Sequence, residues 1–140
     1  MSAHEIIAAE TGAVVKTIGD AVMATFPTPD RALVAALRIR EAMHKLNAKR
    51  KSEDLLLKIG IHEGPCLAVT LNDRQDYFGQ TVNIASRVQG LAMSRSILAT
   101  GAVVEHPTAS ALLKSDGIEP MPRRLPVRGV AEELSVYEIP

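Results

Sequence analysis

The feature that most constrains this chain is a pair of short apolar runs separated by a Gly-Asp turn. The runs occupy residues 13–18 and 21–26, and Gly19 and Asp20 lie between them. A Gly-Asp pair is favoured where the backbone of a two-residue turn needs positive φ. The pattern therefore predicts a tight antiparallel β-hairpin. It also places the carboxylate of Asp20 at the turn, where it can face solvent or a metal ion.

A second motif is the stretch DYFGQTVNIASR at residues 76–87. We expect a loop carrying Asp76 to lead into a helix over residues 80–92. Asn83 and Arg87 are four residues apart, just over one helical turn, so both project from one face. With Lys16 of the hairpin, the two stretches supply a Lys/Asp pair for a base and an amide and a guanidinium for sugar and phosphate.

The rest of the chain alternates between helical and extended patterns. Ser2 and Glu5 have capping-box spacing, and Gly12 is the expected C-cap of the first helix. The predicted helices cover residues 3–11, a long segment from Thr28-Pro29 to the basic run ending at Lys51, residues 80–92 and residues 108–113. The predicted strands are 13–18, 21–26, 55–62, 66–71, 96–100 and a closing hairpin formed by 124–128 and 134–139.

This alternation of helices with antiparallel hairpins indicates an α+β fold arranged as a two-layer sandwich. Its long helix is expected to bury one apolar stripe, because residues of that kind recur at helical spacing. The stripe consists of Ala32, Ala36, Ile39, Met43 and Leu46.

Composition narrows the class of protein further. A chain of 140 residues suits a single domain, and 46% apolar with 23% charged residues is ordinary for a soluble globular protein. Sixteen basic residues balance sixteen acidic ones, which argues against a dedicated nucleic-acid or anionic-membrane surface. The single cysteine, Cys66, excludes an intramolecular disulfide and fits a reducing compartment. With no apolar run of membrane-spanning length and no signal peptide, we expect a cytoplasmic protein.

Taken in this order, the two motifs resemble the catalytic domain of class III nucleotidyl cyclases, the adenylyl and guanylyl cyclases. The resemblance runs from about Ile6 to the end of the chain. It implies a ferredoxin-like βαββαβ core with antiparallel sheet and extra C-terminal strands, and an arm around 66–73 that reaches a partner subunit. The implied activity is adenylate cyclase: conversion of ATP to 3′,5′-cyclic AMP and pyrophosphate in intracellular signalling, with two Mg²⁺ or Mn²⁺ ions.

The resemblance also implies roles for individual residues. Asp20 matches the second of the family's two metal-binding aspartates. Lys16 and Asp76 match its purine-reading pair, a donor and an acceptor that complement the adenine edge. Asn83 matches the amide that orients the ribose, and Arg87 the guanidinium that stabilises the transition state.

Three further residues have expected roles. Arg128, in the stretch LPVRG, falls where the family usually has a phosphate-binding lysine. His62 lies in a Gly-Ile-His-x-Gly stretch and is expected to be structural rather than catalytic. Cys66 is expected to be a small core residue.

One segment of the family pattern is not found in these 140 residues, namely the opening strand with the first metal-binding Asp. We therefore expect residues 1–140 to form a single domain that lacks an N-terminal strand and helix. A truncated enzyme, a degenerate relative or a segment supplied by another chain would each account for this. The resemblance places that strand between the hairpin and the strand at 55–62. The 140 residues alone are therefore expected to be marginally stable, prone to associate and inactive.

The family's site lies between two protomers, so the resemblance implies a homodimer with shared active sites. Two other hypotheses stay open. The chain can be a non-catalytic nucleotide-binding or dimerisation module with the same fold, or a plain ferredoxin-like structural domain that binds no nucleotide.

Overall fold

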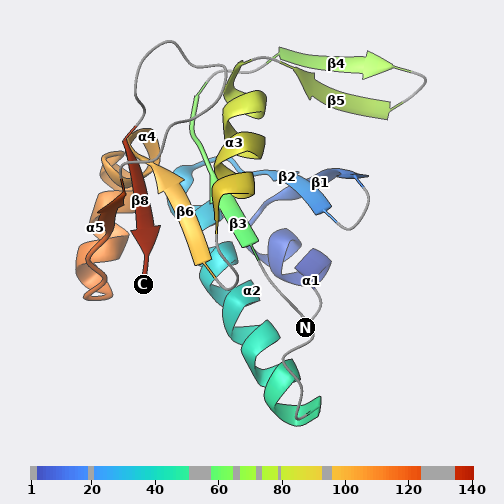
Figure 1. Cartoon of the computed structure of the whole chain (residues 1–140). Helices are drawn as coiled ribbons and strands as arrows, with labels where there is room; N and C mark the ends of the chain where they lie inside the picture. The colour runs from blue at the N-terminus through green and yellow to red at the C-terminus, as the bar shows by residue number, and fades with distance from the viewer. Residues whose placement is uncertain are drawn as a thin grey trace.

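A computed structural model of the chain describes residues 3–18, 21–50, 58–64, 67–71, 74–78, 80–92, 96–123 and 135–140 (Figure 1). The helices are α1 (Ala3–Ala9), α2 (Pro29–Arg50), α3 (Gln80–Leu91), α4 (Gly101–Val104) and α5 (Pro107–Ser115). The strands are β1 (Ala13–Ile18), β2 (Ala21–Thr25), β3 (Lys58–Ile61), β4 (Leu67–Leu71), β5 (Arg74–Phe78), β6 (Ser96–Thr100), β7 (Met121–Arg123) and β8 (Val136–Ile139). The α+β class predicted from the sequence is confirmed.

The predicted hairpin is formed by β1 and β2, which pair antiparallel with Lys16 opposite Met23 and Ile18 opposite Ala21. The register shifts between Val14 and Lys16, so β1 contains a bulge at that point. A bulge bends its strand and changes the direction of the following side chains. The strand therefore has a local irregularity immediately before Lys16.

The largest sheet has four strands in the order β3-β6-β8-β7. β3 and β6 are parallel, whereas β6–β8 and β7–β8 are antiparallel. The parallel pair was not predicted. It is possible because a long crossover that includes the β4–β5 hairpin and α3 joins β3 to β6.

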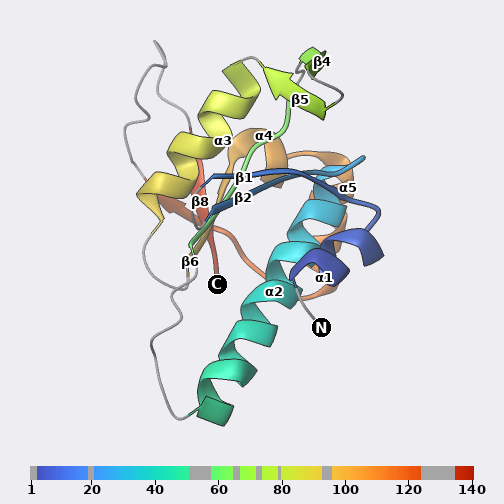
Figure 2. The ribbon, with the colours of Figure 1, turned by 90° about the vertical axis from the view of Figure 1, so that its right-hand side faces the viewer.

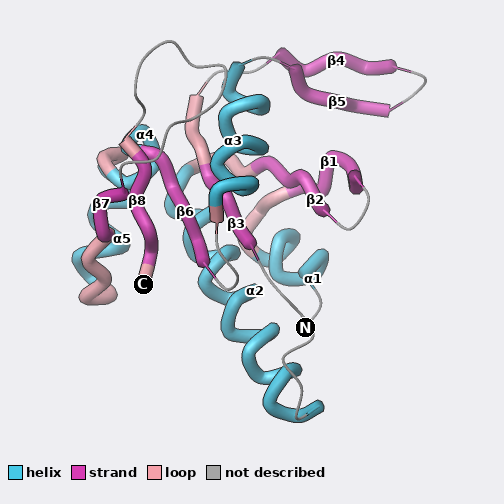
Figure 3. The backbone as a smooth tube through the Cα atoms, viewed as in Figure 1, coloured by secondary structure: helices cyan, strands magenta, loops and turns pink. Residues whose placement is uncertain are grey.

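The end of the chain was predicted to be a closing hairpin. β8 lies within the predicted range 134–139, and its antiparallel partner is β7, with Arg123 opposite Val136 (Figure 3). The Arg123 guanidinium also lies 3.3 Å from the Glu138 carboxylate. The strand predicted at 124–128 lies outside the described residues.

Helices cover both faces of the four-stranded sheet, as Figure 2 shows from the side, so the sheet has a helical layer more than the predicted two-layer sandwich. Alternate residues of β6 face opposite ways: Ile97 and Ala99 pack in the cluster that includes α2, α4 and α5, whereas Leu98 packs with α3. The first cluster comprises Leu33, Ala36, Ile61, Ile97, Ala99, Val103, Val104, Ala109, Leu113 and Ile139. The second comprises Ile84, Val88, Ala92, Leu98 and Val136. The buried strand β6 thus separates two cores.

The buried face of α2 differs from the predicted stripe. Burial is concentrated in the first half of the helix, at Leu33, Ala35 and Ala36. Leu46, at the other end of the predicted stripe, is 38% exposed. Figure 1 shows the reason, because the C-terminal half of α2 extends past the ends of β3 and β6. Periodicity identified the helix, but the length of the sheet decides how much of its apolar face is covered.

The end of α1 also corrects a prediction. The residue with positive φ is Thr11 (φ 63°), not Gly12. The Thr11 and Gly12 amides donate to the carbonyls of Ala8 and Ile7, the pattern of a Schellman motif. Gly12 is required for space instead, since a Cβ there would lie 2.5 Å from the Phe26 ring.

Side-chain contacts fix α2 against its neighbours. Glu10, after α1, lies 3.0 Å from the Arg38 guanidinium and 3.6 Å from that of Arg31. Arg40 donates a 2.9 Å hydrogen bond to the carbonyl of Ile139, which ties α2 to the end of β8.

The β1–β2 and β4–β5 hairpins are two-stranded sheets of their own. The hairpin and β3 therefore belong to different sheets, and the further strand that the resemblance implies between them stays a prediction. Within the described ranges, no helix has the length and apolar character needed to cross a membrane.

Candidate active site

The helix α3 presents Asn83 and Arg87 to solvent. Ile84 and Val88 are buried against the sheet, and the residue preceding each of them, Asn83 and Arg87, is exposed. This follows from helix geometry, because neighbouring residues differ by about 100° around the axis. In the part of the chain that the structure describes, no hydrogen bond or ion pair engages either exposed side chain. As far as the described residues are concerned, both side chains are open to a ligand.

The close packing of α3 against the sheet depends on Gly60 in β3. A Cβ at this position would lie 2.6 Å from the Cα of Gln89 and 2.9 Å from the carbonyl oxygen of Ala85. Since both atoms belong to the backbone of α3, they cannot move aside as a flexible side chain would. Gly60 therefore permits the close contact between β3 and α3 that sets the height of Asn83 and Arg87 above the sheet.

Asp76 lies in a strand rather than in the predicted loop. It belongs to β5, where its partner in the antiparallel ladder is Val69 of β4. The error has a physical reason: a short polar stretch such as RQDYF has a weak strand signal of its own, and the ladder with β4 holds it extended.

The elements that carry the predicted site residues are neighbours. β5 packs beside β1, which carries Lys16, and also beside the helix α3 (Figure 1). The N-terminal end of α3, which includes Asn83, points towards the β4–β5 hairpin (Figure 1). Lys16 is half-buried and follows the bulge in β1. Lys16, Asp76, Asn83 and Arg87 thus come from three adjoining elements.

Two predicted site residues, Asp20 and Arg128, lie outside the described residues. Among the residues that are described, no three His, Cys, Asp or Glu side chains form a group suited to a metal ion. The metal ligand Asp20 and the phosphate contact of Arg128 stay predictions.

A partly buried polar contact lies at the carboxyl ends of β3 and β6. His62 follows β3, and its Nδ1 lies 2.6 Å from the Oγ1 of Thr100, the last residue of β6. Burial lowers the pKa of His62 below its usual value of 6.5, against the opposing effect of the nearby Glu63 carboxylate. The imidazole is therefore neutral at neutral pH. This contact agrees with the structural role expected for His62.

The partner residue, Thr100, was missed by sequence reasoning. A Thr-Gly pair between a strand and a helix indicates an N-cap, and Thr100 is the N-cap residue of α4. Its side chain makes no capping hydrogen bond, however, and contacts His62 instead. No local signal in the sequence distinguishes these two uses of a hydroxyl.

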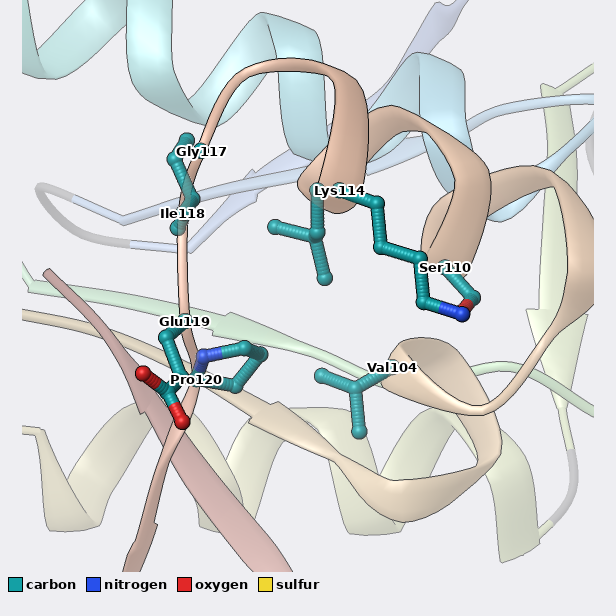
Figure 4. Close-up of a pocket in the computed structure, with 8 residues that line it drawn as sticks. Val104, Ser110, Lys114, Gly117, Ile118, Glu119 and Pro120 are labelled. Atoms are coloured by element: carbon teal, nitrogen blue, oxygen red, sulfur yellow. The ribbon is translucent and has the colours of Figure 1, made fainter.

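A separate hollow of about 320 Å³ lies beside α5 and the segment that leads to β7 (Figure 4). Its walls come from α4, α5 and the segment before β7, and Lys114 and Glu119 are its charged residues. The remaining lining residues are Val104, Ser110, Leu113, Gly117, Ile118 and Pro120. Among the predicted site residues that the structure describes, namely Lys16, Asp76, Asn83 and Arg87, none lines this hollow, so we treat it as separate from them.

Comparison with known proteins identifies the family. The model of the adenylate and guanylate cyclase catalytic domain matches residues 2–134. An adenylate cyclase of Anabaena cylindrica is 32% identical over an alignment that covers 91% of this chain and 28% of that protein. The soluble guanylate cyclase subunit beta-2 of Homo sapiens is 32% identical, with coverage of 75% and 18%. The chain therefore belongs to the adenylate and guanylate cyclase catalytic domain family, and it spans less than a third of the length of these relatives.

Solved structures agree with this assignment. An adenylate/guanylate cyclase/hydrolase from Silicibacter pomeroyi is similar with a TM-score of 0.77 and 27% identity, over 96% of this chain and 76% of that one. A guanylate cyclase domain from Catenaria anguillulae, in complex with GTP, has a TM-score of 0.80 at 23% identity, over 99% of this chain and 77% of that one. The second comparison supports the fold alone.

Proposed function

We propose that this domain converts ATP to 3′,5′-cyclic AMP and pyrophosphate. The observation that carries the proposal is the exposure of Asn83 and Arg87 on α3. This helix lies beside β5, which carries Asp76, and β5 in turn lies beside β1, which carries Lys16. Family membership supports the same reaction class, and adenylate cyclases are among the relatives at about the same identity as a guanylate cyclase.

The reaction is an intramolecular phosphoryl transfer. The ribose 3′-oxygen forms a bond to the α-phosphorus and loses its proton, while the bond from the α-phosphorus to the bridging oxygen breaks. Pyrophosphate leaves with that electron pair. Such a reaction depends mainly on holding the two ends in line and on stabilising charge at the phosphoryl oxygens.

The side chains of α3 have the chemistry for these tasks. The guanidinium of Arg87 stays charged and offers forked donors to phosphoryl oxygens, so it stabilises the charge that develops there. The amide of Asn83, one turn earlier, can both donate to and accept from ribose hydroxyls. Because both extend from one rigid helix, their spacing is preset before the nucleotide binds.

Lys16 and Asp76 are proposed to select the base. A lysine donates to a ring acceptor of adenine, and an aspartate accepts from its exocyclic amino group. Guanine presents a carbonyl acceptor and a ring donor along this edge, so the same pair suits it less well. ATP is therefore proposed as the preferred substrate, with GTP as the competitor to be measured.

The remaining roles rest on the resemblance. Asp20 is proposed to hold Mg²⁺ or Mn²⁺, ions that prefer carboxylate oxygen ligands. When bound, such ions neutralise triphosphate charge. Arg128 is proposed to contact the triphosphate, and a homodimer is proposed to form the complete sites.

The test is a product assay on the full-length protein with Mn²⁺ and either ATP or GTP. We expect cyclic AMP and pyrophosphate in equal amounts from ATP, and a lower rate with GTP. A parallel titration with ATP separates the alternatives. Binding without product would indicate a non-catalytic nucleotide-binding module, and no binding of either nucleotide would indicate a structural domain. A higher rate with GTP would assign the opposite specificity.

A further inference from the structure

The contact between His62 and Thr100 joins two parallel strands at the edge from which α3 begins. Ile61 is opposite Ala99 in the β3–β6 ladder, so His62 and Thr100 are the next residues along each chain. Thr100 is fully buried, and its Oγ1 lies 2.6 Å from the Nδ1 of His62. A hydrogen bond to a fully buried hydroxyl holds the segment after β3 in one position.

The hydroxyl of Thr100 also occupies an unusual place. Thr at an N-cap usually accepts a hydrogen bond from the first turn of its helix. The Thr100 side chain does not do so for α4 and is directed to His62 instead. The position of α4 is held in another way, because the Gly101 amide donates a 2.8 Å hydrogen bond to the carbonyl of Ser135. The Thr100 hydroxyl is thus available for a contact across the sheet.

The segment that follows His62 contacts the first turn of α3. A Cβ at Gly64 would lie 2.8 Å from the Oγ1 of Thr81, so the backbone of this segment runs close to that side chain. Thr81 precedes Asn83 by two residues on the same helix. A continuous set of contacts therefore runs from Thr100 through His62 and Gly64 to the start of α3.

We propose that His62 is a positioning residue that fixes the N-terminal turn of α3, and with it Asn83, through its hydrogen bond to Thr100. The consequence for catalysis rests on the function proposed above for Asn83 and Arg87. His62 does not touch the substrate. It acts by keeping the segment 62–64 against Thr81, while Gly60 fixes the later turns of the helix.

The test compares isosteric pairs in the full-length protein. His62→Leu and Thr100→Val remove the hydrogen bond, whereas His62→Asn keeps a polar atom near the position of Nδ1 and Thr100→Ser keeps the hydroxyl. Val103→Ala is the matched control, because it removes buried packing in α4 and leaves the hydrogen bond intact. Hydrogen–deuterium exchange of the peptide covering residues 80–91 reports the order of α3 directly.

We expect exchange of that peptide to rise about tenfold in His62→Leu and Thr100→Val, and to return towards the parent in His62→Asn and Thr100→Ser. The turnover number with ATP should fall by roughly 10- to 100-fold in the first pair, with KM almost unchanged, because misplacing a catalytic group affects the reacting geometry most. The double variant should lose little more than either single one.

The two proposals fail in different ways. If α3 loosens in His62→Leu and Thr100→Val but the parent makes no cyclic nucleotide, the proposed function is wrong and the positioning role stands. If both variants match Val103→Ala in α3 exchange at equal melting temperature, the positioning role is overturned, whatever the activity of the parent.

Discussion

Arg87 is the residue on which the proposed chemistry depends most directly. Arg87 is exposed on α3, whereas the neighbouring Val88 is buried in the core, so replacing Arg87 leaves the core intact. Arg87→Ala should lower the turnover number with ATP by about 10²–10³-fold, the usual effect of removing one preorganised charge stabiliser. ATP affinity should change much less, because the contact strengthens mainly in the transition state.

Arg87→Lys is the matched control, because it keeps the charge but loses the forked donors. The turnover number of Arg87→Lys with ATP should lie between those of the parent and of Arg87→Ala. Steady-state kinetics together with an ATP titration measure both quantities. A variant that loses affinity and keeps its turnover number would show that Arg87 binds the ground state only.

Lys16 and Asp76 can be tested through selectivity rather than rate. Changing Lys16→Glu and Asp76→Cys together removes the donor and acceptor proposed for adenine, so relative use of GTP should rise. The upper limit for such discrimination is roughly 10⁴-fold, since the penalty comes from unpaired polar groups in a buried site. The measurement is the ratio of kcat/KM for ATP and GTP. An unchanged ratio would exclude both residues from base recognition.

His62 gives the stability of the domain a specific pH dependence. Burial lowers its folded-state pKa, whereas the unfolded chain titrates near 6.5. Below pH 6.5 the unfolded state therefore binds more protons than the folded state, and stability falls until the pH drops below the lowered pKa. The slope for one proton is at most about 1.4 kcal/mol per pH unit.

The comparison of the parent with His62→Asn isolates this contribution. Denaturant unfolding at several pH values between 7.5 and about 4.5 should show a smaller loss of stability in the variant, which has no imidazole to protonate. The nearby Glu63 carboxylate is present in both proteins, but it acts on the pKa of His62 in the parent alone, so the difference reports the net effect of burial and of Glu63. Parallel pH profiles for the two proteins would contradict the lowered pKa of His62.

At the scale of elements, the packing of α3 on β3 depends on the absence of a side chain at Gly60. Gly60→Ala would push a methyl group against the backbone of Ala85 and Gln89. We therefore expect the free energy of unfolding to fall by about 1–3 kcal/mol, the range for an overpacked core. Gly90, on the exposed side of α3, is the matched control, because a Cβ there meets nothing within 4 Å.

Gly90→Ala should be neutral or stabilise the protein by about 0.5–1 kcal/mol, since Ala has the better helix propensity. Urea unfolding of both variants gives the comparison. Equal stability of Gly60→Ala and the parent would mean that α3 can shift on the sheet at no cost. The proposal that the close β3–α3 contact sets the positions of Asn83 and Arg87 would then be wrong.

Some helices and strands could be predicted from sequence patterns alone, and others could not. The β6 segment 96–100 and the β1–β2 hairpin were predicted because local residues determine them: a continuous apolar run and a Gly-Asp turn. The position of Asp76 in β5 and the exposure of Leu46 were not, because a partner strand and the length of the sheet decide them. The short helix α4 was missed for a different reason, because a segment of four residues is too short to show helical periodicity.

At the scale of the whole molecule, the sequence named the candidate residues but not their arrangement. Lys16 and Asn83 are far apart in the chain, and only the packing of β5 beside both β1 and α3 brings their elements together. Helix spacing alone predicted that Asn83 and Arg87 share a face, because that property is local. Asp20 and Arg128 stay predictions from the resemblance.

The proposed homodimer, with sites shared between two protomers, can be tested by mixing inactive variants. If Asp20 acts in a site completed by Arg87 of a second protomer, Asp20→Ala and Arg87→Ala should each be inactive as a homodimer. When equal amounts of the two variants are mixed under conditions in which subunits exchange, half of the dimers are heterodimers. Each heterodimer has one site without any substitution and one site with both. Activity should therefore recover to about a quarter of the parental rate, as two-fold symmetry requires.

The control is a mixture of two variants from the same half of the site, Asn83→Ala and Arg87→Ala. Every site in their heterodimer carries one substitution, so no recovery is expected. Size-exclusion chromatography of each mixture shows whether heterodimers form. Recovery in neither mixture, with heterodimers present, would show that each protomer carries Asp20 and Arg87 in one site of its own.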